Sequence, residues 1–269
     1  MAIDLKGKVV LITGASSGFG QDAARLFAQE GASVVLAARR IEKMQAQVAQ
    51  LHKEGGEAMA TPVDVNNRAD IDNMVKSVIE NYERVDILFN NAGFGRLDWL
   101  ETLDSGRDVQ TQINVNLTGL IEVTRAVLPI MIAQKNGHII NMSSVAGWLG
   151  APMYTVYAAT KFGVRGFTDA LRREVAPHGI KVSGIYPGPA ATEFGLHTGD
   201  NEAIRNFKTP SWTNMSSEYV AKKVVEVAKH PRRRLIIPWW FRPAIWADNQ
   251  MPWLVDWIVN QFFTKKYRQ

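Results

Sequence analysis

The stretch KVVLITGASSGFG, residues 8–20, decides the fold class of this chain of 269 residues. Its first half is a short apolar run, rich in β-branched residues, which is typical of a buried strand. In its second half Gly14, Gly18 and Gly20 stand where a strand turns into a helix. Glycines allow the backbone to approach a pyrophosphate, and the N–H groups that open the helix then face the phosphate charge. The stretch therefore predicts a dinucleotide-binding turn, and without a following Gly-Lys-Ser/Thr it is not a P-loop.

Apolar runs of strand length recur along the chain, with helical patterns between them. Further strands are expected at ASVVLAAR, EAMATPVDV, RVDILFNNAG, GHIINMSS, IKVSGIYPG and RRLIIP, and helices over about 18–30, 41–53, 67–82, 108–134 and 154–176. Strands that are apolar throughout and alternate with helices indicate a parallel sheet covered on both faces. With right-handed crossovers this is a doubly wound α/β fold. We expect one α/β domain over residues 1–238 and an aromatic-rich extension over 239–269 that is not an independent domain.

The end of the second strand bears on the choice of dinucleotide. A site that prefers NAD usually has an acidic side chain here, which binds the ribose 2′-hydroxyl. This chain has Ala38 followed by Arg39 and Arg40. A guanidinium binds a 2′-phosphate through charge-assisted hydrogen bonds, whereas a carboxylate repels it. The pattern favours NADP(H), with one of the two arginines sufficient for the contact.

Two Tyr-x-x-x-Lys pairs, Tyr157 with Lys161 and Tyr219 with Lys223, are candidates for a proton-transfer site. Only the first pair is expected to lie near other polar residues at the same edge of the sheet. Ser144 ends the fifth expected strand, and NNAG at residues 90–93 ends the fourth. Ligands of an open α/β sheet bind beyond the carboxyl ends of its strands. We therefore expect Tyr157 and Lys161 to form the site and Tyr219 with Lys223 to be an ordinary surface pair.

These motifs together, TGASSGFG, NNAG, Asn116, Ser144 and YAATK, resemble the short-chain dehydrogenase/reductases over about residues 5–238. The resemblance implies a seven-stranded Rossmann sheet and hydride transfer between a nicotinamide and a carbonyl or alcohol. It implies that Tyr157 exchanges the proton, Lys161 binds the nicotinamide ribose and lowers the Tyr157 pKa, Ser144 holds the substrate oxygen, and Asn116 anchors a relay water. The cofactor site it implies comprises Gly14, Ser16, Ser17, Gly18, Phe19, Gly20, Arg39, Arg40, Asp64, Val65, Asn91, Ala92, Gly93, Tyr157, Lys161, Pro187, Gly188 and Thr192.

The spacing of Tyr157 and Lys161 supports a shared role, because residues four apart on a helix lie on one face. Moving a tyrosine pKa from about 10 to about 7 needs roughly 4 kcal/mol. One ammonium at about 4–5 Å supplies about 3–4 kcal/mol at an effective dielectric near 20. Together with the charge of an oxidised nicotinamide, this is expected to be sufficient without a metal ion.

The substrate pocket is expected to be apolar or aromatic. Its candidate residues are Phe94, Trp148, Leu149, Met153, Tyr154 and Phe194, with Trp212 as a further one. The segment 189–215 follows the sixth strand and is placed to cover this pocket. Part of the set is expected only to pack against the fold, and nothing in the sequence selects a particular carbonyl compound.

Composition excludes several other classes of protein. Without cysteine there is no disulfide, thiolate metal site or cysteine nucleophile, and the five scattered histidines show no metal-ligand spacing. The net charge of +5 comes without a nucleic-acid motif, so a solvated basic face is expected instead of nucleic-acid binding. The short N-terminal apolar run is not a signal peptide, and no uncharged apolar stretch is long enough to span a bilayer. A cytoplasmic location is the expectation.

The C-terminal extension departs from the family pattern. Five of the eight tryptophans fall within residues 239–269, and Pro252 suits the first turn of a helix. So much apolar surface is expected to be covered. An oligomer interface, an interfacial membrane contact that leaves the protein peripheral to a membrane, and packing on its own subunit remain open. Family resemblance implies a homodimer or homotetramer through the helices that carry Asn116 and Tyr157.

Two other functions compete with an NADP(H)-linked carbonyl reductase or alcohol dehydrogenase. One is a 3-oxoacyl-thioester (acyl-carrier-protein) reductase, against which the apolar extension argues. The other is a dinucleotide-binding sensor or scaffold without turnover. That alternative would be marked by loss of Asn116, Ser144, Tyr157 or Lys161, and all four are present.

Overall fold

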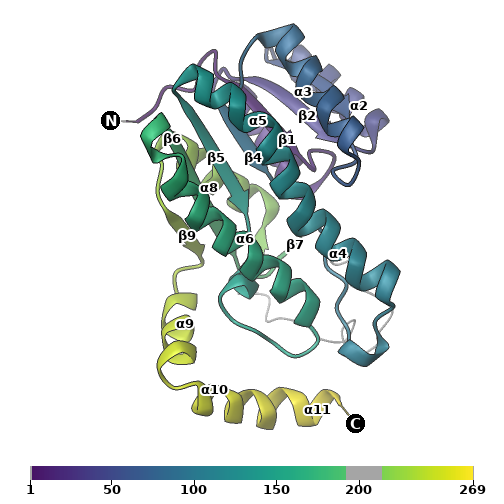
Figure 1. Ribbon diagram of the computed structural model, residues 1–269, viewed down its shortest axis with the longest axis vertical. Helices are drawn as coiled ribbons and strands as arrows, with labels where there is room; N and C mark the ends of the chain where they lie inside the picture. Colours follow the sequence, from purple (N-terminus) through teal and green to yellow (C-terminus); the bar gives the residue numbers. More distant parts are fainter. Residues whose placement is uncertain (1, 192–213, 269) are drawn as a thin grey trace.

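The computed structural model describes residues 2–191 and 214–268. Thr192, Phe194, Trp212 and most of the segment 189–215 lie outside the described residues. A seven-stranded parallel sheet in the order β3-β2-β1-β4-β5-β6-β9 forms the centre of the molecule (Figure 1). Its strands are β1 (Val9–Thr13), β2 (Ser33–Ala38), β3 (Glu57–Pro62), β4 (Ile87–Asn90), β5 (Gly137–Met142), β6 (Ile180–Pro187) and β9 (Arg234–Ile237). The prediction of a doubly wound α/β fold is confirmed.

Helices cover both faces of the sheet and bury two separate apolar cores. On one face α1 (Gly18–Gln29), α2 (Ile41–Lys53) and α8 (Ser217–Lys229) contribute to the first core. On the other face α3 (Arg68–Tyr82), α5 (Leu120–Gln134) and α6 (Thr155–Glu174) contribute to the second. Alternate residues of β1 point to the two cores, with Val10 in the first and Leu11 in the second. This two-sided burial explains why the central strands are mostly apolar, whereas the edge strand β3 is only partly buried.

The helix expected over about 108–134 is a composite. It consists of η2 (Ser105–Gln110), α4 (Thr111–Ile113), η3 (Asn114–Gly119) and α5, of which η2 and η3 have π-helical geometry. By length and composition alone the whole span could cross a membrane. However, Val123, Val127 and Met131 of α5 pack into the second core, so α5 serves here as a core helix.

Most of the remaining elements lie at the carboxyl edge of the sheet or beyond it; the exception is the short helix that directly precedes β6. Short helices η1 (Leu100–Thr102), η4 (Val145–Gly147) and η5 (Ala176–His178) follow strands or helices, and β7 (Ala190–Ala191) pairs with β8 (Met215–Ser216). After β9 come α9 (Phe241–Gln250), α10 (Pro252–Val259), η8 (Asn260–Thr264) and α11 (Lys265–Tyr267). These last elements project from the body of the protein, and α10 to α11 run beneath the edge where the strands end (Figure 1).

Candidate active site

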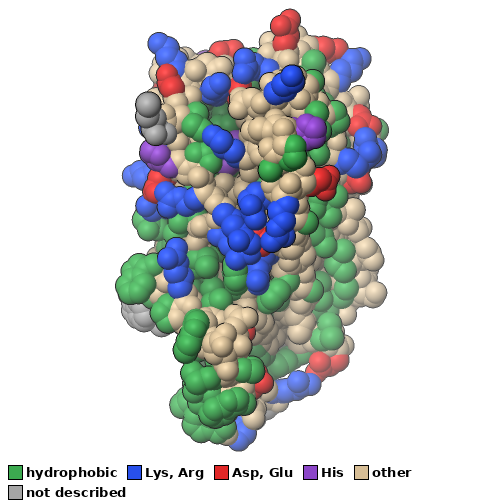
Figure 2. All heavy atoms as spheres, turned by 60° about the vertical axis from the view of Figure 1, so that its left-hand side comes forward, with side chains coloured by type: hydrophobic (Ala, Val, Ile, Leu, Met, Phe, Trp, Pro, Cys, Tyr) green, Lys and Arg blue, Asp and Glu red, His purple; other side chains and the backbone are tan. Residues whose placement is uncertain are grey.

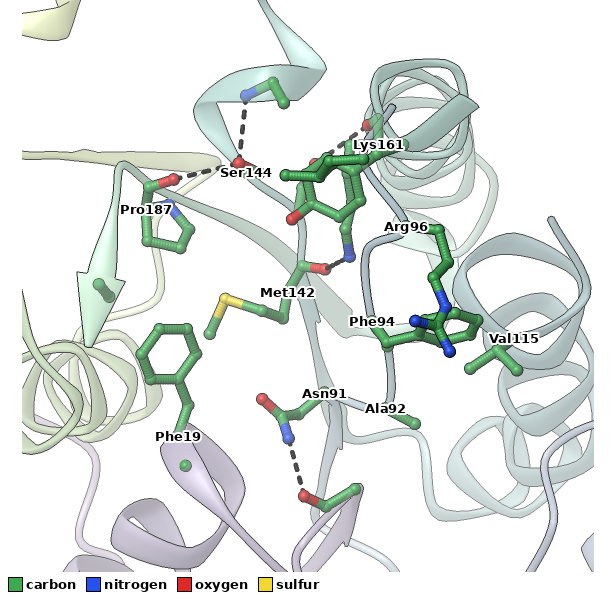
Figure 3. Close-up of a pocket in the computed structure, with 18 of the residues that line it drawn as sticks. Phe19, Asn91, Ala92, Phe94, Arg96, Val115, Met142, Ser144, Lys161 and Pro187 are labelled. Carbon is green, nitrogen blue, oxygen red and sulfur yellow. Dashed lines mark hydrogen bonds between the residues drawn. The ribbon is translucent and has the colours of Figure 1, made fainter. Parts of the chain in front are cut away.

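A cavity of about 1200 Å³ opens at the carboxyl ends of the strands. The glycine-rich turn after β1 lines one part of it, and Ser144, Tyr157 and Lys161 line another. Figure 3 shows Ser144 and Lys161 on one side of this space and Phe19 and Asn91 on the other. The sheet topology thus brings together segments from residue 14 to residue 263.

The glycine-rich turn is shaped to admit a phosphate group. Gly14 has φ of +66°, and a Cβ atom there would lie 2.8 Å from the Cα of Ala92. The side-chain amide of Asn91 donates hydrogen bonds to the carbonyls of Thr13 (3.2 Å) and Gly14 (3.1 Å), which ties the end of β4 to this turn. Helix α1 begins at Gly18, and Ser17 at its N-cap makes no side-chain capping bond. The opening N–H groups are therefore available to a pyrophosphate, so this turn fits a dinucleotide.

Arg40 lies against the same turn. Its Nε donates to the Ser16 hydroxyl at 3.0 Å and its Nη2 to the Ser17 hydroxyl at 2.7 Å. Arg39 is exposed, and both arginines line the cavity. Ala38 stands at the end of β2, where NAD-preferring sites have a carboxylate. The cavity wall beside the turn is therefore cationic.

The other expected cofactor residues are placed as follows. Asp64, Val65, Asn91, Ala92, Gly93, Pro187 and Gly188 line the cavity, together with Ser16, Ser17, Gly18 and Phe19. Gly20 is buried behind the turn, where a Cβ atom would lie 2.7 Å from the Asn91 amide nitrogen, so it shapes the turn without lining the cavity. Thr192 lies outside the described residues.

Ser144, Tyr157 and Lys161 converge where β5 meets α6. The Ser144 hydroxyl accepts a hydrogen bond from the Ala146 N–H at 3.1 Å and donates one to the Pro187 carbonyl at 3.3 Å. Lys161 donates from Nζ to the Met142 carbonyl at 3.2 Å, and its Nζ lies 5.6 Å from the centre of the Tyr157 ring. Tyr157 and Lys161 are both buried. The competing pair is elsewhere: Tyr219 is exposed on α8, away from the cavity.

Burial controls the proton affinities of this pair. It raises the pKa of the Tyr157 phenol well above its ordinary value, although a hydrogen bond with Ser144 acts in the opposite direction. Burial also lowers the pKa of Lys161 to about 8. The expectation that Lys161 brings the Tyr157 pKa toward 7 is therefore not met in the protein alone. The ammonium is directed at the Met142 carbonyl, and the loss of solvation outweighs its attraction for a phenolate.

Asn116 lies behind the cavity wall and is fully buried. Its Oδ1 accepts a hydrogen bond from the Phe94 N–H at 2.9 Å, and its Nδ2 donates to the Phe94 carbonyl at 2.8 Å and to the Thr160 hydroxyl at 3.2 Å. Asn116 stands in η3, and these hydrogen bonds link the loop after β4 to α6. In this structure the residue holds the wall that faces Tyr157.

Phe94, Leu149 and Tyr154 line the cavity as expected, but two other candidates for the substrate pocket do not. The guanidinium carbon of Arg165 lies 3.4 Å from the centre of the Trp148 ring and that of Arg234 lies 4.8 Å from it. These cation–π contacts hold the indole away from the cavity. Met153 is buried with φ of +70°, and its carbonyl accepts the Asp98 N–H at 3.1 Å. Phe194 and Trp212 lie outside the described residues.

The structure adds wall residues that the motifs did not indicate. The main additions at the substrate end are Arg96, Leu97, Arg107, Val115, Phe241, Val259 and Phe263. Val259 and Phe263 come from the C-terminal extension, more than 90 residues after Lys161. Their spacing of four residues on apolar helical sequence was the available signal, but no local pattern says which core or cavity such a pair will meet.

Comparison with known proteins agrees with the geometry. Residues 8–203 match the sequence profile of the short chain dehydrogenase family. The chain belongs to this family. A short-chain dehydrogenase of Burkholderia phymatum, solved in complex with NAD, superposes with a TM-score of 0.83 at 27% identity, covering 94% of this chain and 96% of that one.

Relatives within the family carry several descriptions. An uncharacterised oxidoreductase of Listeria innocua is 41% identical over 80% of this chain and 85% of its own length. The 3-oxoacyl-[acyl-carrier-protein] reductase of Thermotoga maritima is 42% identical over 68% of this chain and 74% of its own length. A dehydrogenase/reductase family protein 7-like sequence of Anopheles gambiae is 34% identical over 96% of this chain and 83% of its own length. Family membership makes the chain an oxidoreductase of the nicotinamide-dinucleotide class.

Proposed function

We propose that this protein is an NADP(H)-dependent oxidoreductase that interconverts an apolar or aromatic carbonyl compound and its secondary alcohol. The observation that supports the proposal is the convergence of Ser144, Tyr157 and Lys161 on the cavity that the glycine-rich turn also lines. The intact set of polar residues argues against a sensor or scaffold without turnover. In this proposal residues 1–238 form the oxidoreductase domain and 239–269 its extension.

In the reductive direction Tyr157 acts as the general acid. Its raised pKa keeps the phenol protonated at neutral pH, so a proton is available for the substrate oxygen. A bound nicotinamide would supply or accept the hydride at the substrate carbon. The Ser144 hydroxyl, held by Ala146 and Pro187, orients the substrate oxygen toward Tyr157. The Lys161 ammonium supports the negative charge that develops on Tyr157 once its proton has moved.

The preference for NADP(H) rests on the cationic wall beside the turn. Arg40 is held in place by Ser16 and Ser17, so its guanidinium is preorganised near the expected ribose position. A preorganised guanidinium loses little freedom when it binds a phosphate. Arg39, exposed on the same wall, is free to approach the 2′-phosphate from the outer side.

The substrate class follows from the walls near Tyr157. The apolar side chains that line the cavity include those of Phe94, Leu97, Leu149, Tyr154, Phe241, Val259 and Phe263. Removing such surfaces from water stabilises an apolar ligand by about 25 cal/mol per Å². This supports a hydrophobic ketone, aldehyde or secondary alcohol as the substrate.

A 3-oxoacyl thioester is the second candidate substrate. It is favoured by the similarity to the Thermotoga maritima reductase and by Arg96 and Arg107, two cations that line the cavity. However, buried Asp108 already pairs with both, at 2.7 Å from Arg107 and 3.6 Å from Arg96.

The proposal is tested by following NADPH and NADH absorbance with a panel of hydrophobic ketones, their alcohols and a 3-oxoacyl thioester. Turnover of a hydrophobic ketone with NADPH, lost in Tyr157→Phe, is the expected result. A preference for the thioester would select the second candidate. Failure of every carbonyl and alcohol, despite NADPH binding, would support a non-catalytic role.

The proposal also covers assembly and location. We expect a homodimer or homotetramer formed by the helices that carry Asn116 and Tyr157, in which Gly166 leaves room for a neighbouring helix, while Gly163 packs on Leu117 of its own subunit. The cytoplasm is the proposed location, since NADPH-linked reduction needs a supply of the reduced cofactor. Light scattering of the purified chain measures its mass directly.

A further inference from the structure

The C-terminal extension has two different apolar faces. Val259 and Phe263 face inward and line the cavity. On the outer face, side chains that ordinarily avoid water are highly exposed: Trp239 (69%), Trp246 (61%), Trp253 (69%), Trp257 (55%), Ile258 (43%) and Phe262 (70%). We call these six residues the outer aromatic face. They contrast with the sheet and its helices, where apolar side chains are mostly buried.

Positive charge lies on the same side of the molecule. Figure 2 shows a dense group of Lys and Arg side chains in the middle of the face whose lower end is covered by hydrophobic side chains. Arg165, Arg233 and Arg234 form one cluster, because Arg165 and Arg234 both contact the Trp148 ring and Arg233 and Arg234 share one carboxylate. A single carboxylate, Asp169, pairs with Arg233 at 3.1 Å and with Arg234. Three guanidinium groups and one carboxylate leave this cluster cationic.

The extension itself is also cationic. Residues 239–269 contain Arg242, Lys265, Lys266 and Arg268 against Asp248 and Asp256, a net charge of +2. Lys265 and Lys266 are exposed directly after the helical turn that carries Phe262. The end of the extension is anchored to the body, because Arg268 pairs with Glu101 at 2.8 Å and its guanidinium carbon lies 4.8 Å from the centre of the Trp99 ring. This surface contact places the end of the extension beside the segment after β4, while the outer aromatic face stays exposed.

We propose that the outer aromatic face, together with the neighbouring cations, docks on an anionic lipid surface. Tryptophan suits the boundary between water and acyl chains, because its ring is apolar and its N–H can still bond to water or headgroups. Basic side chains beside it are attracted to anionic lipids. The helices project from the body (Figure 1), so they enter a deformable interface without the matching recess that a second copy of the chain would have to provide.

The position of the extension gives docking a consequence for the cavity. The helix that meets the lipid with Trp253 and Trp257 also supplies Val259 to the cavity wall. A docked protein would therefore hold the cavity within one helix thickness of the lipid. The docking itself does not depend on the proposed reaction.

Vesicle sedimentation with the full chain tests the proposal. We expect binding to vesicles of phosphatidylcholine with phosphatidylserine, weaker binding without phosphatidylserine, and a decrease as salt shortens the Debye length from about 10 Å at 0.1 M to about 3 Å at 1 M. Lys265→Gln with Lys266→Gln should weaken binding about fivefold per residue. Trp253→Ser with Trp257→Ser should weaken it at least about tenfold, because the buried apolar area is lost.

Tyr219→Ser is the matched control, since Tyr219 is an exposed aromatic residue on α8, and it should bind vesicles like the wild type. Tryptophan quenching by brominated lipids in the wild type gives a measurement that needs no variant. The proposal is overturned if the wild type ignores anionic vesicles and bromolipids leave its fluorescence unchanged, or if the tryptophan variant binds as well as the wild type. It is equally overturned if the wild type forms an oligomer that the tryptophan variant cannot form while vesicles are ignored, because a second copy would then cover this face.

Discussion

Lys161→Met should make the protein more stable at neutral pH while removing its activity. Lys161 is buried, and its pKa is lowered to about 8 from an ordinary 10.5. At 1.36 kcal/mol per pKa unit, the charged side chain lowers the folding stability by about 3 kcal/mol at pH 7. Methionine fills a similar volume without a charge. The lost hydrogen bond to the Met142 carbonyl offsets about 1 kcal/mol of this gain, so a net gain of about 2 kcal/mol is expected.

The pH dependence of this gain has a definite sign. Below pH 8 the ammonium is present in both the folded and the unfolded chain, and its full cost is felt. Between about pH 8 and 10.5 the folded protein loses this proton first, so the unfolded state binds more protons and the stability of the wild type rises with pH. Above about pH 10.5 the electrostatic part of the difference between wild type and variant disappears.

Urea unfolding of both proteins at pH 7 and near pH 10, without added cofactor, measures the effect. Lys223→Met is the control, because Lys223 is partly exposed and paired with Glu226 at 2.6 Å, and its replacement should not stabilise the protein. A Lys161→Met protein that is less stable than the wild type at pH 7, or a gain that does not change with pH, would refute the reasoning from burial.

The other predictions concern the proposed proton donor, the cofactor and the extension. Tyr157→Phe should lower turnover by about 10²–10⁴ with little change in NADPH affinity, whereas Tyr219→Phe should leave turnover intact; the opposite pattern in steady-state kinetics would place the site elsewhere. Arg39→Ala with Arg40→Ala should weaken NADPH binding by about 2–4 kcal/mol and NADH binding far less, as measured by fluorescence titration, and equal tightness of both cofactors in the wild type would contradict this prediction. Phe263→Ala should raise KM for hydrophobic ketones about thirtyfold at unchanged NADPH affinity, because about 2 kcal/mol of apolar contact is lost; an unchanged KM would show that this wall does not meet the substrate.

Much of the fold is written locally in the sequence. Parallel strands buried on both faces are mostly apolar, so runs such as VVLIT and SVVLAA stand out without any tertiary knowledge. A backbone that turns with a positive φ, as at Gly14, favours glycine. The glycine-rich turn can therefore be predicted from the sequence as well. The four-residue spacing of Tyr157 and Lys161 placed both on one face of α6 for the same local reason.

Other properties of the site depend on residues that are distant in the sequence, so only the tertiary structure reveals them. The sequence predicts Trp148 in the pocket, but its ring instead contacts Arg165 and Arg234. No local sequence pattern predicts which cation an indole ring will contact. The pKa of Tyr157 is raised mainly because the surrounding segments remove water from its phenol. The local sequence shows only the lysine four residues later, and it does not show how deeply the phenol is buried. Phe263 likewise joins the cavity because the extension crosses beneath the sheet edge. Local propensity determines the elements of this protein, and the packing of distant elements determines the environment in which each side chain acts.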